Sequence, residues 1–262
     1  CRKPALPPKE ISTIEELYLN GIHLRQYKHF AYCPEDYFRE GLARDPGDIR
    51  CNKAMGDFYL ARGEWEKAIG HYDAAIKRLT LRNPNPYDTE PLYKRALCYF
   101  RLGNYDKAYN DAYASVWSYP QRSVGYYLLA KLEARKGNVT AAKNFLQESL
   151  RTNADHLFAV YMLGILDGDL QIEKTVSDRD PLFFEGMYLV KNVAHFALEV
   201  MDFGYYELAK KFLLQANDGA MKFYYLAYAE KWCGNDVTAQ KYVALADAAD
   251  WRCEFPCRAE SA

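Results

Sequence analysis

A motif built around one glycine recurs five times along this 262-residue chain. In each copy an alanine follows the glycine by five residues, as in LGNYDKAYNDAYASV (102–116), and another small residue precedes the glycine by seven. The glycines are Gly63, Gly103, Gly137, Gly204 and Gly234, the alanines are Ala68, Ala108, Ala142, Ala209 and Ala239, and the earlier small residues are Gly56, Ala96, Ala130, Ala197 and Ala227. This pattern predicts units of two helices joined by a glycine turn, in which small residues let the paired helices approach closely.

Bulky residues in the second helix of each unit are expected to fill the space that the small residues leave. We expect this role for Tyr72, Leu146, Leu213 and Val243. Gly103 and Gly137 are 34 residues apart, whereas Gly63 and Gly103 are 40 apart. The unit length is therefore about 34 residues, with six extra residues before the third unit.

The segment RNPNPYD (82–88) accounts for those extra residues. Pro84 and Pro86 cannot continue a helix, and each pushes the asparagine before it into an extended or turn conformation. We therefore expect a spacer on the edge of the array, followed by a helix that begins near 89–91. It is either a rigid spacer or a rim that contacts a ligand or another domain, with Asn85 and Tyr87 as the exposed candidates.

The repeated motif resembles the tetratricopeptide repeat (TPR), whose period is 34 residues. The resemblance covers most of 14–250 and is clearest in AMGDFYLARGEWEKAIGHYDAAI and ALCYFRLGNYDKAYNDAYASV. The runs RDPGDIRCNKAMGDFYLARGEWEKAI and YYLAYAEKWCGNDVTAQKYVALADAADWRCEFP are also similar to the C-terminal part of large bacterial proteins. Those proteins carry an N-terminal mutarotase-like β-sandwich domain of unknown function, so the resemblance implies a fragment of such a protein.

The predicted fold is all-α: a TPR-like, right-handed superhelical solenoid of stacked helix-turn-helix units with an irregular fourth unit. The first unit lacks the glycine turn, and the fourth loses its second-helix signature in DLQIEKTVSDRDPLFFEG. The predicted divisions are a linker (1–13), the first three units with the first helix of the fourth (14–166), an irregular break (167–190), two further units (191–250) and a C-terminal tail (251–262).

Composition narrows the classes of function. The 34 Lys and Arg against 35 Asp and Glu give no broad positive field for nucleic acid or anionic lipid, and the longest apolar run, 158–166, is too short to span a bilayer. Seven scattered cysteines favour a reducing cytoplasm, and Cys253 and Cys257 are expected to be small apolar residues rather than zinc ligands. We expect a cytoplasmic location, although a processed lipoprotein could also begin with a residue such as Cys1.

No catalytic or metal-binding motif appears in the sequence. The acidic run DGDLQIEKTVSD (167–178) has calcium-loop spacing, but Ile172 stands where the glycine belongs and Asp178 where the bidentate Glu belongs. Glu35 with Asp36, or Asp57, could form an acid/base pair, but solvated surface charges are the better interpretation. We therefore predict a non-enzymatic chain with no catalytic residues, no metal and no cofactor.

The resemblance to TPR arrays implies a concave groove lined by the first helix of each unit. The predicted ligand-groove residues are Tyr18, Arg50, Lys53, Tyr93, Phe100, Arg101, Tyr127, Lys131, Arg135, Tyr224, Tyr228 and Lys231. Such a groove would be aromatic and partly basic, although any of these tyrosines could instead be packed between helices. The carboxylate clamp of chaperone-binding TPR proteins does not fit, because Asp57, Val124 and Leu128 stand where that clamp needs Asn, Lys and Arg.

Two functions remain open at this point. The first is a non-catalytic interaction or docking module that binds a protein or peptide partner, or the parent protein's own N-terminal domain. The second is an accessory region of a carbohydrate-active bacterial enzyme, which would contact an oligosaccharide by stacking tyrosines on sugar rings.

Overall fold

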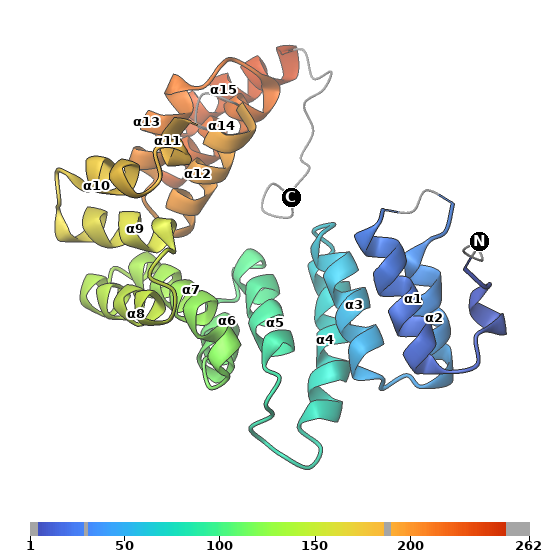
Figure 1. The fold of residues 1–262 in the computed structure, drawn as a ribbon. Coiled ribbons are helices and arrows are strands. Elements are labelled where there is room, and N and C mark those ends of the chain that lie inside the picture. The colour runs from blue at the N-terminus through green and yellow to red at the C-terminus, as the bar shows by residue number, and fades with distance from the viewer. Residues whose placement is uncertain (1–4, 29–30, 186–189, 250–262) are drawn as a thin grey trace. The chain divides into compact units, whose positions relative to one another are not determined.

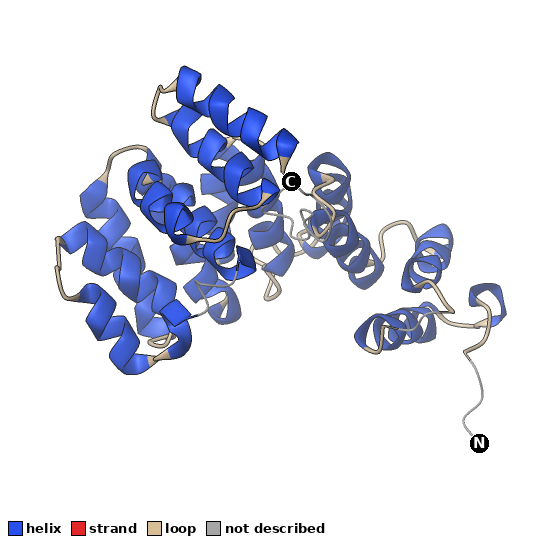
Figure 2. Cartoon of the chain, turned by 90° about the horizontal axis from the view of Figure 1, so that it is seen from above, coloured by secondary structure: helices blue, strands red, loops and turns tan. Residues whose placement is uncertain are grey.

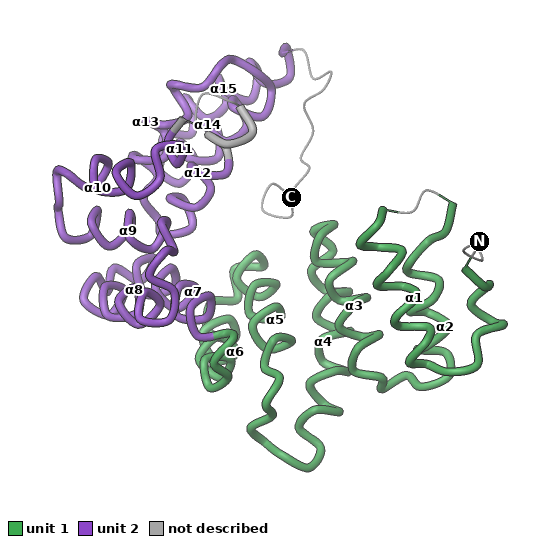
Figure 3. Tube along the Cα trace, viewed as in Figure 1, with its two compact units in different colours: residues 1–121, 262 green, residues 122–261 purple. Residues whose placement is uncertain are grey.

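The described part of the chain consists of helices and connecting loops only (Figures 1 and 2). The structure is a computed structural model, and it describes residues 5–28, 31–185 and 190–249. The chain divides into two compact units, of which unit 1 ends at Gln121 and unit 2 begins at Arg122 (Figure 3). The predicted all-α helical-repeat fold is confirmed, whereas Cys253 and Cys257 lie outside the described residues.

Unit 1 is a series of three helix pairs in which each helix packs on its neighbours along the chain. A short 3₁₀ helix (Pro8–Glu10) packs on the first pair. The helices are α1 (Ile14–Gln26), α2 (Pro34–Arg44), α3 (Ile49–Leu60), α4 (Trp65–Leu79), α5 (Glu90–Arg101) and α6 (Tyr105–Ser115).

Unit 2 begins with a regular pair, continues through short helices and ends with two further pairs. The short helices α10 and α11 fall in the segment where the sequence predicts an irregular break. The helices are α7 (Arg122–Arg135), α8 (Val139–Thr152), α9 (Leu157–Asp167), α10 (Ile172–Arg179), α11 (Leu182–Glu185), α12 (Val190–Asp202), α13 (Tyr206–Gln215), α14 (Ala220–Trp232) and α15 (Asp236–Ala248).

The five motif glycines each form the turn between the two helices of a pair. All five have positive φ, between 70° and 85°, a region that L-residues with a side chain rarely adopt. The turns also share a hydrogen bond: the amide of Asn104 donates to the carbonyl of Tyr99 at 2.8 Å, and that of Asn138 donates to Glu133 at 2.9 Å. The repeated glycine therefore encodes one turn geometry, as predicted.

Close contact between paired helices occurs both in units with the sequence motif and in units that lack part of it. In a unit with the motif, a Cβ added at Gly56 of α3 would lie 2.5 Å from the ring of Tyr72 on α4, so the tyrosine packs directly on the helix backbone. Gly21 of α1 stands in the same relation to Phe38 on α2. Gly164 of α9 does so to Ile172 on α10, so the irregular first and fourth pairs keep the packing rule.

The predicted packing residues are buried, with one exception. Ala68, Ala108, Ala142 and Ala209 are fully buried, as are Ala96, Ala130 and Ala197, and the bulky residues Tyr72, Leu146 and Leu213 are at most 1% exposed. Val243 was expected to act in the same way, but it is 40% exposed. On α15 it is Ala239 and Ala246 that are buried, so the prediction for Val243 is wrong.

The spacer between α4 and α5 is held at both ends. The side chain of Asn83 accepts a hydrogen bond from the amide of Asn85 at 3.0 Å, and that of Asp88 accepts from the amide of Glu90 at 3.0 Å. The buried Thr89 donates to the carbonyl of Ser115 at 2.7 Å. α5 therefore begins at Glu90, within the range 89–91 that was predicted from the two prolines. Tyr87 of the spacer is 87% exposed.

Candidate functional site

Three first helices of unit 1, α1, α3 and α5, are linked to one another by side chains of the predicted groove residues. Arg50 of α3 forms an ion pair with Glu15 of α1, and its guanidinium carbon lies 5.2 Å from the ring centre of Tyr18. The hydrogen bond with Glu15 raises the pKa of Arg50. Arg50 and Tyr18 are thus brought together, and the cation is already neutralised.

A second set of ion pairs links α3 to α5. Lys53 contacts Asp88 at 2.6 Å and Glu90 at 2.7 Å, while Lys94 contacts Glu90 at 2.6 Å and Asp57 at 2.8 Å. Burial opposes the charge of Glu90, yet hydrogen bonds from the two lysines lower its pKa to about 2. Each cation therefore lies between two carboxylates.

We call the surface formed by these side chains the α1–α3–α5 face. Its charged members are Glu15, Arg50, Lys53, Asp57, Asp88, Glu90 and Lys94. Asp57 also accepts a hydrogen bond from the buried hydroxyl of Tyr72, which ties the face to α4. The sequence indicated a partly basic surface, whereas each of the three cations on this face is paired with one or two carboxylates.

The other predicted groove residues of unit 1 differ in their exposure. Tyr93 is half-buried, and Phe100 is buried with the guanidinium carbon of Arg101 5.5 Å from its ring centre. The rim candidates Asn85 and Tyr87 are exposed in the spacer. Since Asp88 of that spacer contacts Lys53, the spacer adjoins the α1–α3–α5 face.

In unit 2 the predicted groove residues of α7 point into packing against α12. The hydroxyl of Tyr127 donates to Glu199 at 2.9 Å, and Lys131 contacts Glu199 at 2.6 Å and Asp202 at 3.0 Å. Arg135 donates to the carbonyl of Met201 at 3.1 Å. Tyr127 and Lys131 are at most 8% exposed, so they serve the α7–α12 contact rather than an open surface.

The predicted residues of α14 lie on an exposed aromatic stripe. Tyr224 and Tyr228 are 43% and 47% exposed, and Trp232, one further turn along, is 53% exposed. Lys231 beside them is also exposed. The groove residues predicted from the sequence do not include Trp232 or its neighbour Tyr206, although aromatic residues at 224, 228 and 232 share one face of a helix by their spacing of four.

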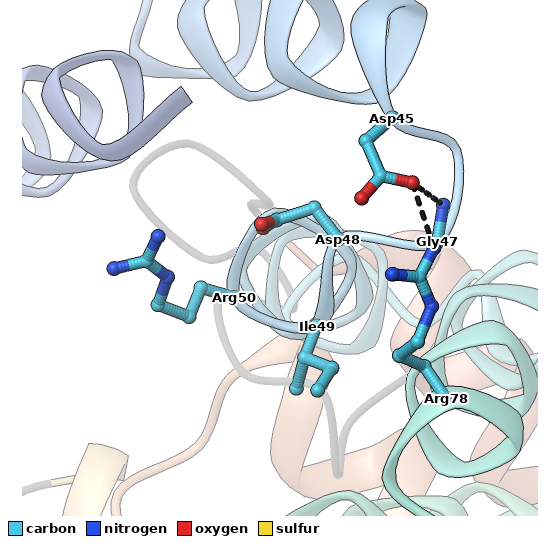
Figure 4. A pocket seen from close by; sticks show the side chains of 6 residues that line it. All are labelled: Asp45, Gly47, Asp48, Ile49, Arg50 and Arg78. Carbon is cyan, nitrogen blue, oxygen red and sulfur yellow. Dashed lines mark hydrogen bonds and ion pairs between the residues drawn. The ribbon is translucent and has the colours of Figure 1, made fainter. Parts of the chain in front are cut away.

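A small hollow lies at the start of α3 (Figure 4). It has a volume of about 260 Å³ and is lined by Asp45, Gly47, Asp48, Ile49, Arg50 and Arg78. Asp45 accepts from the amide of Gly47 at 2.9 Å and from Arg78 of α4 at 2.8 Å, and Asp48 caps α3 by accepting from the amide of Cys51. These bonds join the loop before α3 to α4, which is a structural role.

Two buried cysteines are poorly suited to act as nucleophiles. Burial raises the pKa of the Cys51 and Cys98 thiols to about 12, which disfavours the reactive thiolate. Burial also lowers the pKa of His71. Asp167, in the calcium-like run, pairs with Lys143 at 2.8 Å. Over the described ranges no group of three or more His, Cys, Asp or Glu is placed to hold a metal ion.

The length and polarity of the helices bear on whether the chain could span a membrane. Throughout the described part of the chain, each helix is too short or too polar to traverse a lipid bilayer.

A solenoid of paired helices with exposed side chains on its first helices defines a class of helical-repeat proteins. Within this chain, residues 92–121 and 125–156 match sequence profiles of the tetratricopeptide repeat. The chain therefore carries tetratricopeptide repeats, on both sides of the boundary between the two units.

Part of the chain is similar in sequence to a known protein with tetratricopeptide repeats. Over 100 residues the chain is 35% identical to the tetratricopeptide repeat and J domain-containing co-chaperone DNJ1 of Fusarium oxysporum f. sp. lycopersici. That match covers 37% of this chain and 18% of the co-chaperone, so the chain spans less than a fifth of that relative's length.

Solved structures share the fold at low identity. A tetratricopeptide repeat protein from Parabacteroides merdae has a TM-score of 0.56 and 15% identity, over 90% of this chain and 93% of that one. The pilF protein of Pseudomonas aeruginosa has a TM-score of 0.51 and 17% identity, over 87% of this chain and 88% of that one. These similarities do not bear on an upstream β-sandwich domain or a bacterial parent, so both stay predictions.

Proposed function

We propose that this chain is a non-catalytic interaction module that docks a peptide segment or another domain on the α1–α3–α5 face. The observation that carries the proposal is the set of ion pairs that link these three first helices. Arg50 of α3 pairs with Glu15 of α1, and Lys53 and Lys94 join α3 to α5 through contacts of 2.6–2.8 Å with carboxylates. Repeat solenoids expose such first-helix faces as extended binding surfaces.

The ion pairs prepare this face for binding. Because Lys53 and Lys94 are each held between two carboxylates, they lose little conformational freedom when a partner arrives. The face offers ammonium donors and carboxylate acceptors side by side, which matches the alternating N–H and C=O groups of a peptide backbone. A docked backbone can therefore exchange its water contacts for fixed polar groups.

Aromatic side chains supply apolar contact area on the same helices. Tyr18 and Tyr93 are half-buried, so each ring is partly fixed by packing and partly open to a partner. Rigid aromatic residues of this kind are frequent energetic anchors of interfaces. The exposed Tyr87 and Asn85 form the rim of this surface in the proposal, since Asp88 anchors their spacer to Lys53.

A selection from a random library of displayed 15-residue peptides tests the proposal. The expected result is a family of enriched peptides whose affinity falls at least about tenfold, or 1.4 kcal/mol, for the variant Tyr18→Ala/Tyr93→Ala. The matched control is Tyr113→Ala, because Tyr113 is 51% exposed on α6, a second helix of its pair. The control should bind normally.

Two outcomes contradict the proposal. One is that no peptide family is enriched on the 262-residue chain. The other is that every enriched peptide family binds the Tyr18/Tyr93 variant and the unmodified chain equally while circular dichroism shows both to be fully helical.

A further inference from the structure

The aromatic stripe of α14 is a second surface with its own geometry. Tyr224, Tyr228 and Trp232 are four residues apart and 43%, 47% and 53% exposed. Residues so spaced stand about 6 Å apart along a helix, because each residue rises about 1.5 Å. The stripe therefore extends about 12 Å along α14.

Neighbouring side chains hold the end of the stripe in a fixed arrangement. The rings of Trp232 and Tyr206 of α13 are parallel, with an interplanar angle of 3° and centres 5.7 Å apart. Tyr228 meets Trp232 edge to face at 6.2 Å. The guanidinium carbon of Arg135 on α7 lies 5.6 Å from the Trp232 ring centre and 6.0 Å from that of Tyr206.

The two ends of the stripe differ in charge. Arg135 and the exposed Lys231 place two cations at the Trp232 end. The nearby carboxylates Glu207 and Glu230 both contact Lys210, at 2.8 and 3.1 Å. At the other end Tyr224 donates a hydrogen bond to Asp247 at 2.7 Å. A partner that lies along the stripe therefore meets positive charge at the tryptophan.

We propose that this stripe docks an acidic, amphipathic peptide segment, with large apolar side chains one helical turn apart and a carboxylate directed at Lys231 and Arg135. The inference rests on the proposed docking function and adds a second surface and the chemistry of its partner. Apolar side chains at i and i+4 of a partner helix match the spacing of the rings on α14. The carboxylate gains charge-assisted hydrogen bonds from the two cations.

Ring orientation favours a peptide over an oligosaccharide. A flat sugar stacks on rings that share a plane, whereas Tyr228 and Trp232 are inclined at 62°. Inclined rings present one ring face beside one ring edge, and a bulky peptide side chain can contact both. A peptide side chain uses both rings, and a sugar ring can lie on only one.

Selections with a random library of displayed 15-residue peptides test this inference on three forms of the 262-residue chain. The forms are the unmodified chain, Tyr228→Ser/Trp232→Ser and Lys231→Glu. The unmodified chain should enrich a family rich in Asp and Glu with paired aromatic or aliphatic residues. That family should bind the double variant about 30-fold more weakly, the effect of losing an interfacial aromatic anchor. On Lys231→Glu the enriched peptides should carry fewer acidic residues.

The matched control is Tyr113→Ser/Trp117→Ser. It removes another Tyr and Trp four residues apart, which are 51% and 68% exposed in unit 1, and it should leave the acidic family unchanged. The melting curves of both double variants check that the fold persists.

Several results would overturn the inference. The first two are an enriched family that depends on the stripe but is basic or neutral, and an acidic family that binds the Tyr228/Trp232 variant normally. The third is binding of soluble oligosaccharides that is lost in the Tyr228/Trp232 variant. The fourth is self-association of the chain that the same variant abolishes. If peptides are enriched but depend only on Tyr18 and Tyr93, this inference fails and the proposed function stands. If no peptide is enriched on any form, the proposed function fails too.

Discussion

Replacement of Lys131 by Met should destabilise unit 2 strongly. Lys131 is 7% exposed, and its ammonium contacts Glu199 at 2.6 Å and Asp202 at 3.0 Å. The two carboxylate side chains are 15% and 9% exposed, so the substitution leaves two like charges with little solvent. Removing one partner of a buried ion pair costs about 3–5 kcal/mol. Met occupies much of the volume of the lysine stem, so we expect a loss near the lower end, about 3 kcal/mol.

A double variant identifies the cause. Glu199→Gln removes one of the two carboxylate charges, so Lys131→Met/Glu199→Gln should be more stable than Lys131→Met. A packing defect alone would leave the single and the double variant equally unstable. The comparison of these two variants therefore separates the two causes.

Hydrogen exchange in increasing urea measures this effect, because it resolves α7 and α12 from the helices of unit 1. The control is Lys136→Met, since Lys136 is 46% exposed and 3.5 Å from Glu133, where an ion pair contributes at most about 1 kcal/mol. A loss for Lys131→Met no larger than that of the control, or no recovery of stability in the double variant, would contradict this explanation.

Three further perturbations test the packing and the charges. Ala130→Leu should cost about 1–3 kcal/mol in urea unfolding, because Ala130 is fully buried between helices, and a neutral result would contradict close packing there. Burial lowers the pKa of His71, so its stabilising contribution is complete above about pH 6.5 and decreases as the pH falls. The melting temperature of His71→Gln should therefore change less between pH 7.5 and 5.5 than that of the unmodified chain. An equal change in melting temperature for both proteins would contradict this prediction. The pKa of Glu90 is lowered to about 2, so its contribution to stability is present above about pH 4.3 and is lost toward pH 2. Glu90→Gln should therefore have a lower melting temperature than the unmodified chain at pH 7 and the same melting temperature at pH 2. Equal melting temperatures at both pH values would contradict this prediction.

Local rules in the sequence predicted the turns and the helix pairs. A tight turn with positive φ favours glycine, and a helix backbone in contact with a bulky side chain needs a small residue. Gly137 meets the first requirement and Gly56 the second, so both can be recognised without a structure. The same contact at Gly21 was not recognised, because the α1–α2 pair lacks the glycine turn that made the other copies align. The α9–α10 pair does turn at Gly168, with φ of 73°, but Gly164 precedes that glycine by four residues rather than seven, so this copy did not align either.

The candidate surfaces depend on contacts between distant residues, and the sequence predicts those poorly. Tyr127 and Lys131 have the spacing of surface residues on α7, but α12, about 70 residues later, covers them with Glu199 and Asp202. Lys53 looks like a free cation in the sequence, yet Asp88 and Glu90 reach it across the spacer.

The most direct test of docking on the first helices is hydrogen exchange of the 262-residue chain with and without a peptide enriched by selection. We predict protection of first helices, either 14–26, 49–60 and 90–101 on the α1–α3–α5 face or 220–232 on the stripe of α14. Protection confined to the second helices of the pairs, 34–44, 65–79 and 105–115 in unit 1 or 139–152 and 236–248 in unit 2, would contradict it.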